Sequence, residues 1–213
     1  MIIQSMQKNG LILAAFALAT TGAVALINDL TKDKIASQEQ QHLMQLLSQV
    51  IAAGKYDNTL YLDCTTSNAL ELGPGGPHTI YRARLNGEPS ALLVRHITPK
   101  GYSGNIDVLT AIDRQGLISG VRVTRHEETP GLGDKVELAK SAWVTTFNGV
   151  QVEGEGEADP KMNVKKDGGQ FDSFTGATIT PRAVVTSVNQ AAWFAKTHFD
   201  ALFNAPNTCE VSQ

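Results

Sequence analysis

Residues 171–185 read FDSFTGATITPRAVV and place hydroxyl groups and very small side chains just before an expected helix. Thr180-Pro181 predicts the helix start, because Thr is a good N-cap and Pro suits the first helical position. A first helical turn presents unpaired N–H groups and a partial positive charge, which favour a phosphate. A phosphate site and a plain loop-to-helix junction both remain open. Five residues here either are small enough for close backbone approach or carry a hydroxyl that can donate to a phosphate: Thr175, Gly176, Ala177, Thr178 and Thr180.

The hydrophobic pattern on either side of this turn predicts an α+β fold. Downstream, apolar residues recur at helical spacing on one face as far as Phe199. Upstream, four runs of strand character are joined in pairs by turn-forming residues, which makes the sheet mainly antiparallel. With helices outside the strands, this order favours an antiparallel sheet flanked by helices over βαβ repeats. The four runs are residues 79–85, 91–97, 106–112 and 117–123, and residues 134–147 are expected to be helical.

The N-terminal region predicts a membrane anchor. No charged residue lies between Lys8 and Asp29, and residues 11–27 read LILAAFALATTGAVALI. A helix of about 20 residues rises roughly 30 Å, enough to span the hydrocarbon core. Ala23-Val24-Ala25 resembles a signal-peptide cleavage site, so a cleaved leader is the alternative. Because apolar character continues to Leu30, we expect a retained single-pass anchor.

The orientation of this anchor is only weakly encoded. Lysines flank both ends, so the count of Lys and Arg nearly ties. A short N-terminal tail before a large soluble domain is typical of a signal-anchor, which predicts the domain outside the cytoplasm. The expected segments are an anchor at 1–30, an amphipathic connecting helix at 31–54, a domain at 55–205 and a tail at 206–213.

Composition and ligand spacing exclude several kinds of site. The 213 residues carry a net charge of -3, which gives no basic footprint for nucleic acid. Cys64 and Cys209 lie outside any CxxC pattern, so neither zinc nor an iron–sulfur cluster is expected. A disulfide between them and two unpaired thiols are both open. The consecutive residues 126–128, His-Glu-Glu, would point to alternating faces of a strand, so we expect no metal there.

Two motifs resemble those of a known family of flavoproteins. Residues 172–178, DSFTGAT, resemble the Asp-x-x-Ser/Thr-Gly-Ala-Thr pattern recognised by flavin transferase, with Thr175 where many members have Ser. Residues 126–135, HEETPGLGDK, look like the second signature of FMN-binding domains. The whole chain resembles the G-subunit family of Rnf (Rsx) electron-transport complexes. More distantly, it is similar to the C subunit of the sodium-pumping NADH:quinone reductase.

The resemblance implies a covalent FMN and names the residues that would hold it. Thr178 matches the threonine whose hydroxyl is joined to the FMN phosphate. Thr175, Gly176 and Ala177 match its neighbours on the phosphate side. Thr129 and Leu132 match positions that approach the isoalloxazine ring, while Glu127 or Glu128 lies either near the flavin or in a solvated turn.

The resemblance also implies the role of the chain. It would be an electron-transfer subunit without substrate turnover of its own, working with other membrane subunits of an Rnf-type complex after a flavin transferase has loaded it. Its place would be the bacterial inner membrane, with the domain on the periplasmic side. Two alternatives remain: an anchored adaptor without a cofactor, and a hydrolase with Thr178 as nucleophile, for which no catalytic base or oxyanion hole stands out.

Overall fold

The computed structural model describes residues 2–209 of the chain. They divide into two compact units, Met1–Leu43 and Met44–Gln213, the first helical and the second built around a sheet. Helix α1 (Ile2–Val50) begins in the first unit and ends in the second. The anchor and the connecting segment are therefore one continuous helix, which stops four residues before Gly54.

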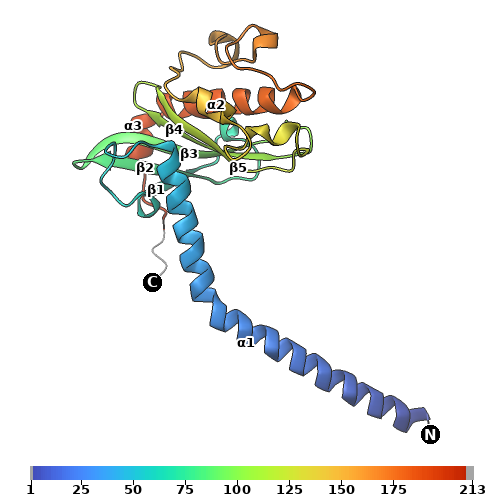
Figure 1. Cartoon of the computed structure of the whole chain (residues 1–213). Helices are drawn as coiled ribbons and strands as arrows, with labels where there is room; N and C mark the ends of the chain where they lie inside the picture. The colour runs from blue at the N-terminus through green and yellow to red at the C-terminus, as the bar shows by residue number, and fades with distance from the viewer. Residues whose placement is uncertain (1, 210–213) are drawn as a thin grey trace. The chain divides into compact units, whose positions relative to one another are not determined.

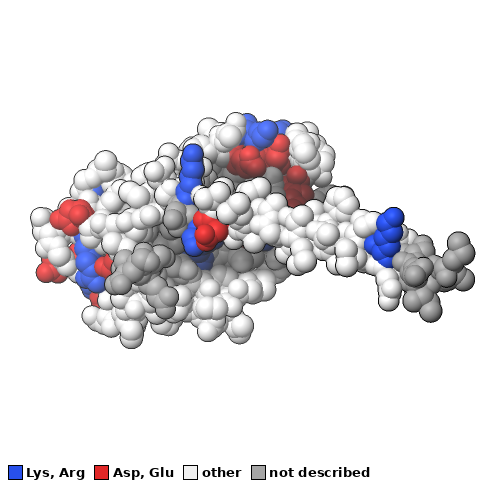
Figure 2. Space-filling model, turned by 90° about the horizontal axis from the view of Figure 1, so that it is seen from below, with Lys and Arg blue, Asp and Glu red and all other residues white. Residues whose placement is uncertain are grey.

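The first unit carries the apolar part of α1. The stretch Met6–Lys32 has a mean hydropathy of 2.2 and, among the described residues, is the one helical stretch long and apolar enough to cross a membrane. Figure 2 shows this stretch as a run of uncharged atoms between charged side chains. The hydroxyl of Thr20 is satisfied within the helix, because it donates to the carbonyl of Phe16 at 2.9 Å.

The second unit contains a five-stranded antiparallel sheet in which each strand pairs with the next along the chain (Figure 1). This confirms the antiparallel α+β fold, and four of the strands are those the sequence predicts. The first strand was not predicted, because its four residues carry no alternating pattern. The strands are β1 (Cys64–Ser67), β2 (His78–Leu85), β3 (Glu88–Thr98), β4 (Ile106–Asp113) and β5 (Ile118–Arg125).

Helix α2 (Ile179–Thr197) lies across β3 and β4 on one face of the sheet (Figure 1). Register determines which strand residues meet it: Leu92 pairs with Ile112, and Val94 with Thr110. The helix contributes small and β-branched side chains, so that its axis can approach the sheet closely. Those that are fully buried include Val184, Val188, Ala191, Ala192 and Ala195. The short helix α3 (Phe199–Asn204) follows.

The last turn of α1 covers part of the opposite face of the sheet. Leu47, Val50 and Ile51 are each no more than 2% exposed. The backbone of α1 comes so close to β5 that a Cβ on Gly120 would lie 2.6 Å from the carbonyl oxygen of Val50. Glycine is therefore required at position 120 for this helix end to pack on the sheet.

The segment between β5 and α2 has no α-helix, so the expected helix at residues 134–147 is wrong. Ser141 has an extended backbone, and its hydroxyl accepts the N–H of Trp143, which interrupts the helix. In the same segment, the rings of Phe147 and Phe171 stack with their centroids 4.3 Å apart. The 3₁₀ turns are η1 (Leu60–Leu62), η2 (Leu70–Leu72), η3 (Gly133–Val136), η4 (Ala142–Phe147), η5 (Gly156–Ala158) and η6 (Lys165–Asp167).

A disulfide joins Cys64 of β1 to Cys209 near the C-terminus, with Cα atoms 5.3 Å apart. The N–H of Thr208 also donates to the carbonyl of Cys64 at 2.9 Å. The open alternative between a disulfide and two thiols is thus resolved in favour of the disulfide. Residues 207–209 are thus held against the edge strand β1.

The buried polar cluster between the sheet and α2 is centred on His96. Its Nδ1 and Nε2 lie 2.7 Å from Ser187 Oγ and 2.8 Å from Thr110 Oγ1, and the ring is fully buried. Burial lowers the pKa of His96 from 6.5 to about 3, and the nearby His78 adds to the shift. The imidazole is therefore neutral at neutral pH.

His96 predicts a loss of stability in mild acid. At a pH below 6.5, His96 binds a proton in the unfolded chain but stays neutral in the folded chain. The free energy of unfolding is therefore highest above pH 6.5 and falls as the pH is lowered toward 3. The expected slope is about 1 kcal/mol per pH unit. Denaturant titrations of His96→Gln should show a flatter dependence between pH 6.5 and 4, whereas exposed His42→Gln should match the parent. Equal slopes for both would contradict the assignment.

Candidate functional site

A cavity of about 320 Å³ opens at the N-terminal end of α2. Three segments form its walls: the connection between β3 and β4, the segment after β5, and the turn that leads into α2. Such a convergence of distant segments beside a helix N-terminus is typical of a ligand site. The lining residues are Tyr102, Glu128, Thr129, Leu132, Gly133, Gly176, Ala177, Thr178, Ile179 and Thr180.

The turn before α2 depends on glycine. The N–H of Ala177 donates to the carbonyl of Phe174 at 3.1 Å, which closes a tight turn. Within it, Gly176 has a φ of 81°, in the left-handed region that favours glycine. A Cβ at this position would stand 3.5 Å from Leu132, across the cavity. Gly176 thus sets the backbone direction that brings the next two residues to the cavity.

Thr178 occupies the N-cap position of α2, so the helix begins at Ile179 and the expected N-cap at Thr180 is wrong. The hydroxyl of Thr178 makes no capping hydrogen bond. It accepts instead from Nζ of Lys166 at 3.1 Å, and the side chain is partly exposed. This hydroxyl is therefore accessible at the cavity edge and has a cation beside it.

Lys166 differs from its cationic neighbours in having no carboxylate partner among the side chains that the structure describes. Lys165 pairs with Asp172 at 2.7 Å, and Arg182 pairs with Asp167 at 2.6 Å. The hydrogen bond from Arg182 lowers the pKa of Asp167. The ammonium group of Lys166 also lowers the pKa of Asp167, and its hydrogen bond goes to the hydroxyl of Thr178.

Glu128 connects the three walls of the cavity. Its side chain is only 4% exposed. One carboxylate oxygen accepts the N–H of Ser103 at 3.0 Å, and the other accepts the hydroxyl of Thr180. The hydroxyl of Thr180, which the sequence offered to phosphate, is thus already used within the protein.

Large apolar side chains stand at the rim of the cavity. Tyr102 is 69% exposed, Leu132 42% and Ile179 47%. Each comes from a different wall, so together they give the opening an apolar border. Such side chains are suited to contact a flat aromatic ring that enters between them.

The structure brings together five of the six residues predicted for cofactor binding. Thr129, Leu132, Gly176, Ala177 and Thr178 line one cavity. Thr175 is exposed at the start of the turn and is not among the lining residues. The sequence did not single out Tyr102 or Lys166, since both lie in glycine-rich connections without a pattern. Only their position in the fold shows that they belong here.

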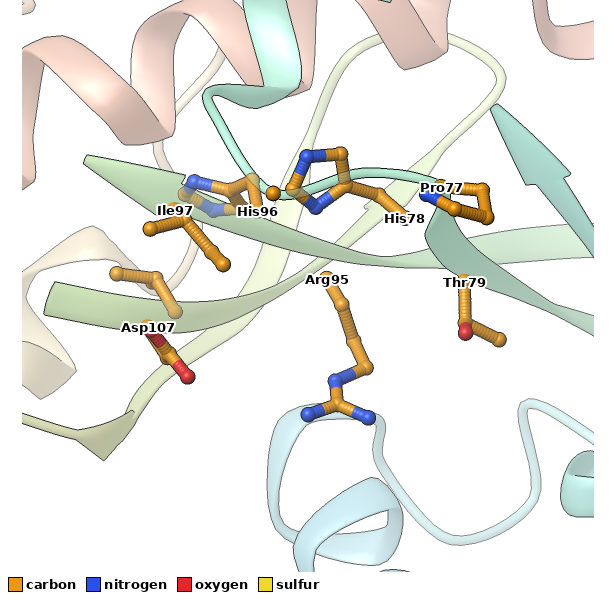
Figure 3. A pocket seen from close by; sticks show the side chains of 9 residues that line it. Pro77, His78, Thr79, Arg95, His96, Ile97 and Asp107 are labelled. Atoms are coloured by element: carbon orange, nitrogen blue, oxygen red, sulfur yellow. The ribbon is translucent and has the colours of Figure 1, made fainter. Parts of the chain in front are cut away.

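A second cavity, of about 180 Å³, is lined by polar side chains that lie on both sides of the strands (Figure 3). The rings of His78 and His96 lie on the α2 side of the strands, whereas Arg95, Thr79 and Asp107 point to the other side. Because residues alternate in direction along a strand, these side chains do not share one site. The described part of the chain holds no cluster of three or more metal-ligating side chains either.

Two family models match the chain. One, described as the RnfG N-terminal region, matches residues 1–50, and the other, described as the FMN-binding domain, matches residues 101–192. The second range contains the whole lining of the 320 Å³ cavity.

Curated relatives match over nearly the full length. The chain is 48% identical over 209 residues to the G subunit of the ion-translocating oxidoreductase complex of Vibrio cholerae, covering 98% of this chain and 99% of that one. The protein of the same name from Aliivibrio fischeri is 47% identical over 211 residues, covering 99% and 100%. A crystal structure of Shewanella oneidensis NqrC has a TM-score of 0.44 and 23% identity, covering 73% and 70%.

Replacing Gly176 by Ala should disturb the cavity specifically. A left-handed φ costs a residue with a side chain about 1 kcal/mol, so thermal denaturation should reveal a modest loss of stability. The flavin content per protein should also fall, because the turn that presents Thr178 shifts.

Gly149→Ala is the matched control. Gly149 has a φ of 78° and open space around it, away from the cavity lining. It should lose similar stability and keep its flavin. Equal flavin content in the two variants would show that the turn geometry is not needed for the site.

Proposed function

This chain belongs to the family of G subunits of ion-translocating oxidoreductase complexes, and we propose that it carries its FMN on Thr178 through a phosphoester bond. The protein is a membrane-anchored, FMN-binding subunit of such a complex and acts in electron transfer. When bound, FMN supplies one- and two-electron redox chemistry, while the protein binds and orients it.

The environment of the Thr178 hydroxyl carries this proposal. A phosphodiester at that oxygen keeps one negative charge. The first turn of α2 provides unpaired N–H groups and a partial positive charge for it, and Lys166 adds a full one. The hydroxyl is not needed as a helix cap, so its modification removes no capping bond.

The cavity suits the ring end of FMN. Its volume of about 320 Å³ is at the low end for ligand sites, and its rim is apolar. Leu132, Thr129 and Tyr102 would hold the isoalloxazine, and Gly176 and Ala177 would lie beneath the phosphate. A covalent tether gives an effective concentration on the order of mM, so a shallow site stays occupied. A shallow site also leaves the ring edge accessible to redox partners.

The role we propose is that of a relay without its own substrate. Other subunits of the complex deliver and receive the electrons, and a flavin transferase installs the FMN during maturation. The residues around the cavity then bind and orient the flavin and hold its phosphate charge. They do not need to act as acid, base or nucleophile toward a substrate.

The disulfide supports a periplasmic position for the domain. Disulfides persist in oxidising compartments and are rare in the bacterial cytoplasm. Cys64 and Cys209 both lie in the second unit, C-terminal to the anchor. We therefore place the chain in the inner membrane with one span, its N-terminus inside and its flavin domain outside.

Thr178→Ala should abolish covalent flavin. On a denaturing gel of protein made together with a flavin transferase, the parent band should fluoresce and the variant band should not, because no hydroxyl remains to form the ester. Intact mass should show the parent heavier by FMN less one water, and the variant at its polypeptide mass.

Two controls separate attachment from folding. Thr66→Ala should keep fluorescence, since Thr66 is exposed in β1 and lies outside both the DSFTGAT motif and the cavity lining. Thr178→Ala should retain its Cys64–Cys209 disulfide and its thermal transition. A fluorescent Thr178→Ala band would place the flavin on another residue and refute the assignment.

The orientation can be tested with a membrane-impermeant maleimide on spheroplasts. Cys64→Ser frees Cys209, which should be labelled without lysis. A Ser5→Cys chain, whose other two cysteines are bonded to each other, should be labelled only after lysis. The reverse pattern would place the domain in the cytoplasm.

A further inference from the structure

Glu128 is a buried carboxylate whose hydrogen-bond partners both donate to it. Ser103 offers a backbone N–H and Thr180 offers a hydroxyl. Two donors on two oxygens suit an ionised carboxylate, which only accepts. The two contacts thus provide the donors that a carboxylate in the wall of the cavity needs.

This carboxylate has no cationic partner among the side chains that the structure describes. Its oxygens form no ion pair with any lysine, arginine or histidine there. The nearest imidazole in sequence, His126, accepts the backbone N–H of Glu128 through Nδ1 and pairs with Glu137 through Nε2. The charge of Glu128 is thus compensated by neutral dipoles alone.

Two glycines make room for the carboxylate. A Cβ on Gly101 would lie 2.7 Å from one oxygen, and a Cβ on Gly133 would lie 2.8 Å from the other. Neither position tolerates a side chain while Glu128 keeps its place. The backbone at both glycines therefore leaves room for the carboxyl group of Glu128, and at Gly101 also for the carbonyl of Gly104.

We propose that Glu128 lowers the reduction potential of the flavin held in this cavity, by placing an unneutralised negative charge in its wall. This inference rests on the proposed function, in which the cavity holds the FMN ring. In this role Glu128 sets the flavin potential through the electric field of its carboxylate. It also holds together the three segments that form the cavity walls.

The direction follows from electrostatics. When the ring takes up two electrons and one proton, it gains one net negative charge. A fixed anion in a water-poor cavity opposes that gain more strongly than it would in water. Charges near the flavin ring are a recognised means by which a protein sets its electronics. Removing the charge should therefore favour the reduced flavin.

Glu128→Gln in the full-length, flavin-loaded protein tests this directly. Glutamine has the same shape, can accept from Ser103 through its carbonyl, and can donate to Thr180 through its amide. In an anaerobic titration with dithionite and an indicator dye, the equilibrium constant for two-electron reduction should rise at least tenfold. For a two-electron couple, that is about 30 mV.

Two further variants separate charge from shape. Glu128→Asp keeps the charge but shortens the side chain, so its reduction equilibrium should stay within about threefold of the parent. Glu127→Gln removes an exposed charge from the neighbouring residue and should also stay within about threefold, because solvent screens it. An unchanged Glu128→Gln would overturn the proposal. So would an equal shift in Glu128→Asp, since it would attribute the effect to shape.

The same samples distinguish this inference from the attachment to Thr178. Flavin fluorescence on a denaturing gel reports the covalent bond whatever the potential. A fluorescent Glu128→Gln band with parental potential would refute only the tuning role. A parent band without fluorescence would refute only the covalent bond, and the potential could still be measured on FMN bound to the folded protein.

Discussion

The packing of α2 across β3 and β4 is the constraint on which the site depends. The small and β-branched side chains of α2 let the helix approach the sheet closely, and His96 fixes it by a buried bond to Ser187. Once the helix axis is fixed, its first turn can lie in only one place. That turn meets the connection between β3 and β4 and the segment after β5, and the cavity is the space between the three.

The strands and α2 were predictable because each has a local signal. Alternation at period two marks β2 to β5, and apolar spacing at period 3.6 marks α2. β1 was not predicted because it is a short edge strand without an alternating pattern. It becomes a strand by pairing with β2, which lies further along the chain. The segment after β5 was misread as a helix because its apolar residues pack as 3₁₀ turns around a serine that breaks the helix. The interrupting bond from Trp143 N–H to Ser141 Oγ is local, but the apolar spacing used for the prediction does not reveal it.

The residues of the candidate site also fall into those that the sequence predicts and those that only the structure identifies. The motif around Thr178 and the proposed ring contacts Thr129 and Leu132 carry a sequence signature, and the fold brings them to one cavity. Lys166, Tyr102 and the pairing of Thr180 with Glu128 have no such signature. They become visible only when segments that are distant in the sequence meet in space. The sequence therefore predicts the kind of ligand, and the structure shows which charged side chains lie around the cavity.

The Cys64–Cys209 bond has a further consequence for chain integrity. It closes a covalent ring with a sequence separation of 145, and that ring contains every strand, the long polar connection before α2, and Thr178. If a protease cuts that exposed connection once, the C-terminal fragment with α2 remains bonded to the fragment that carries α1. With the flavin on Thr178 as proposed, a nicked molecule would thus keep its redox group fastened to the membrane until the disulfide was reduced.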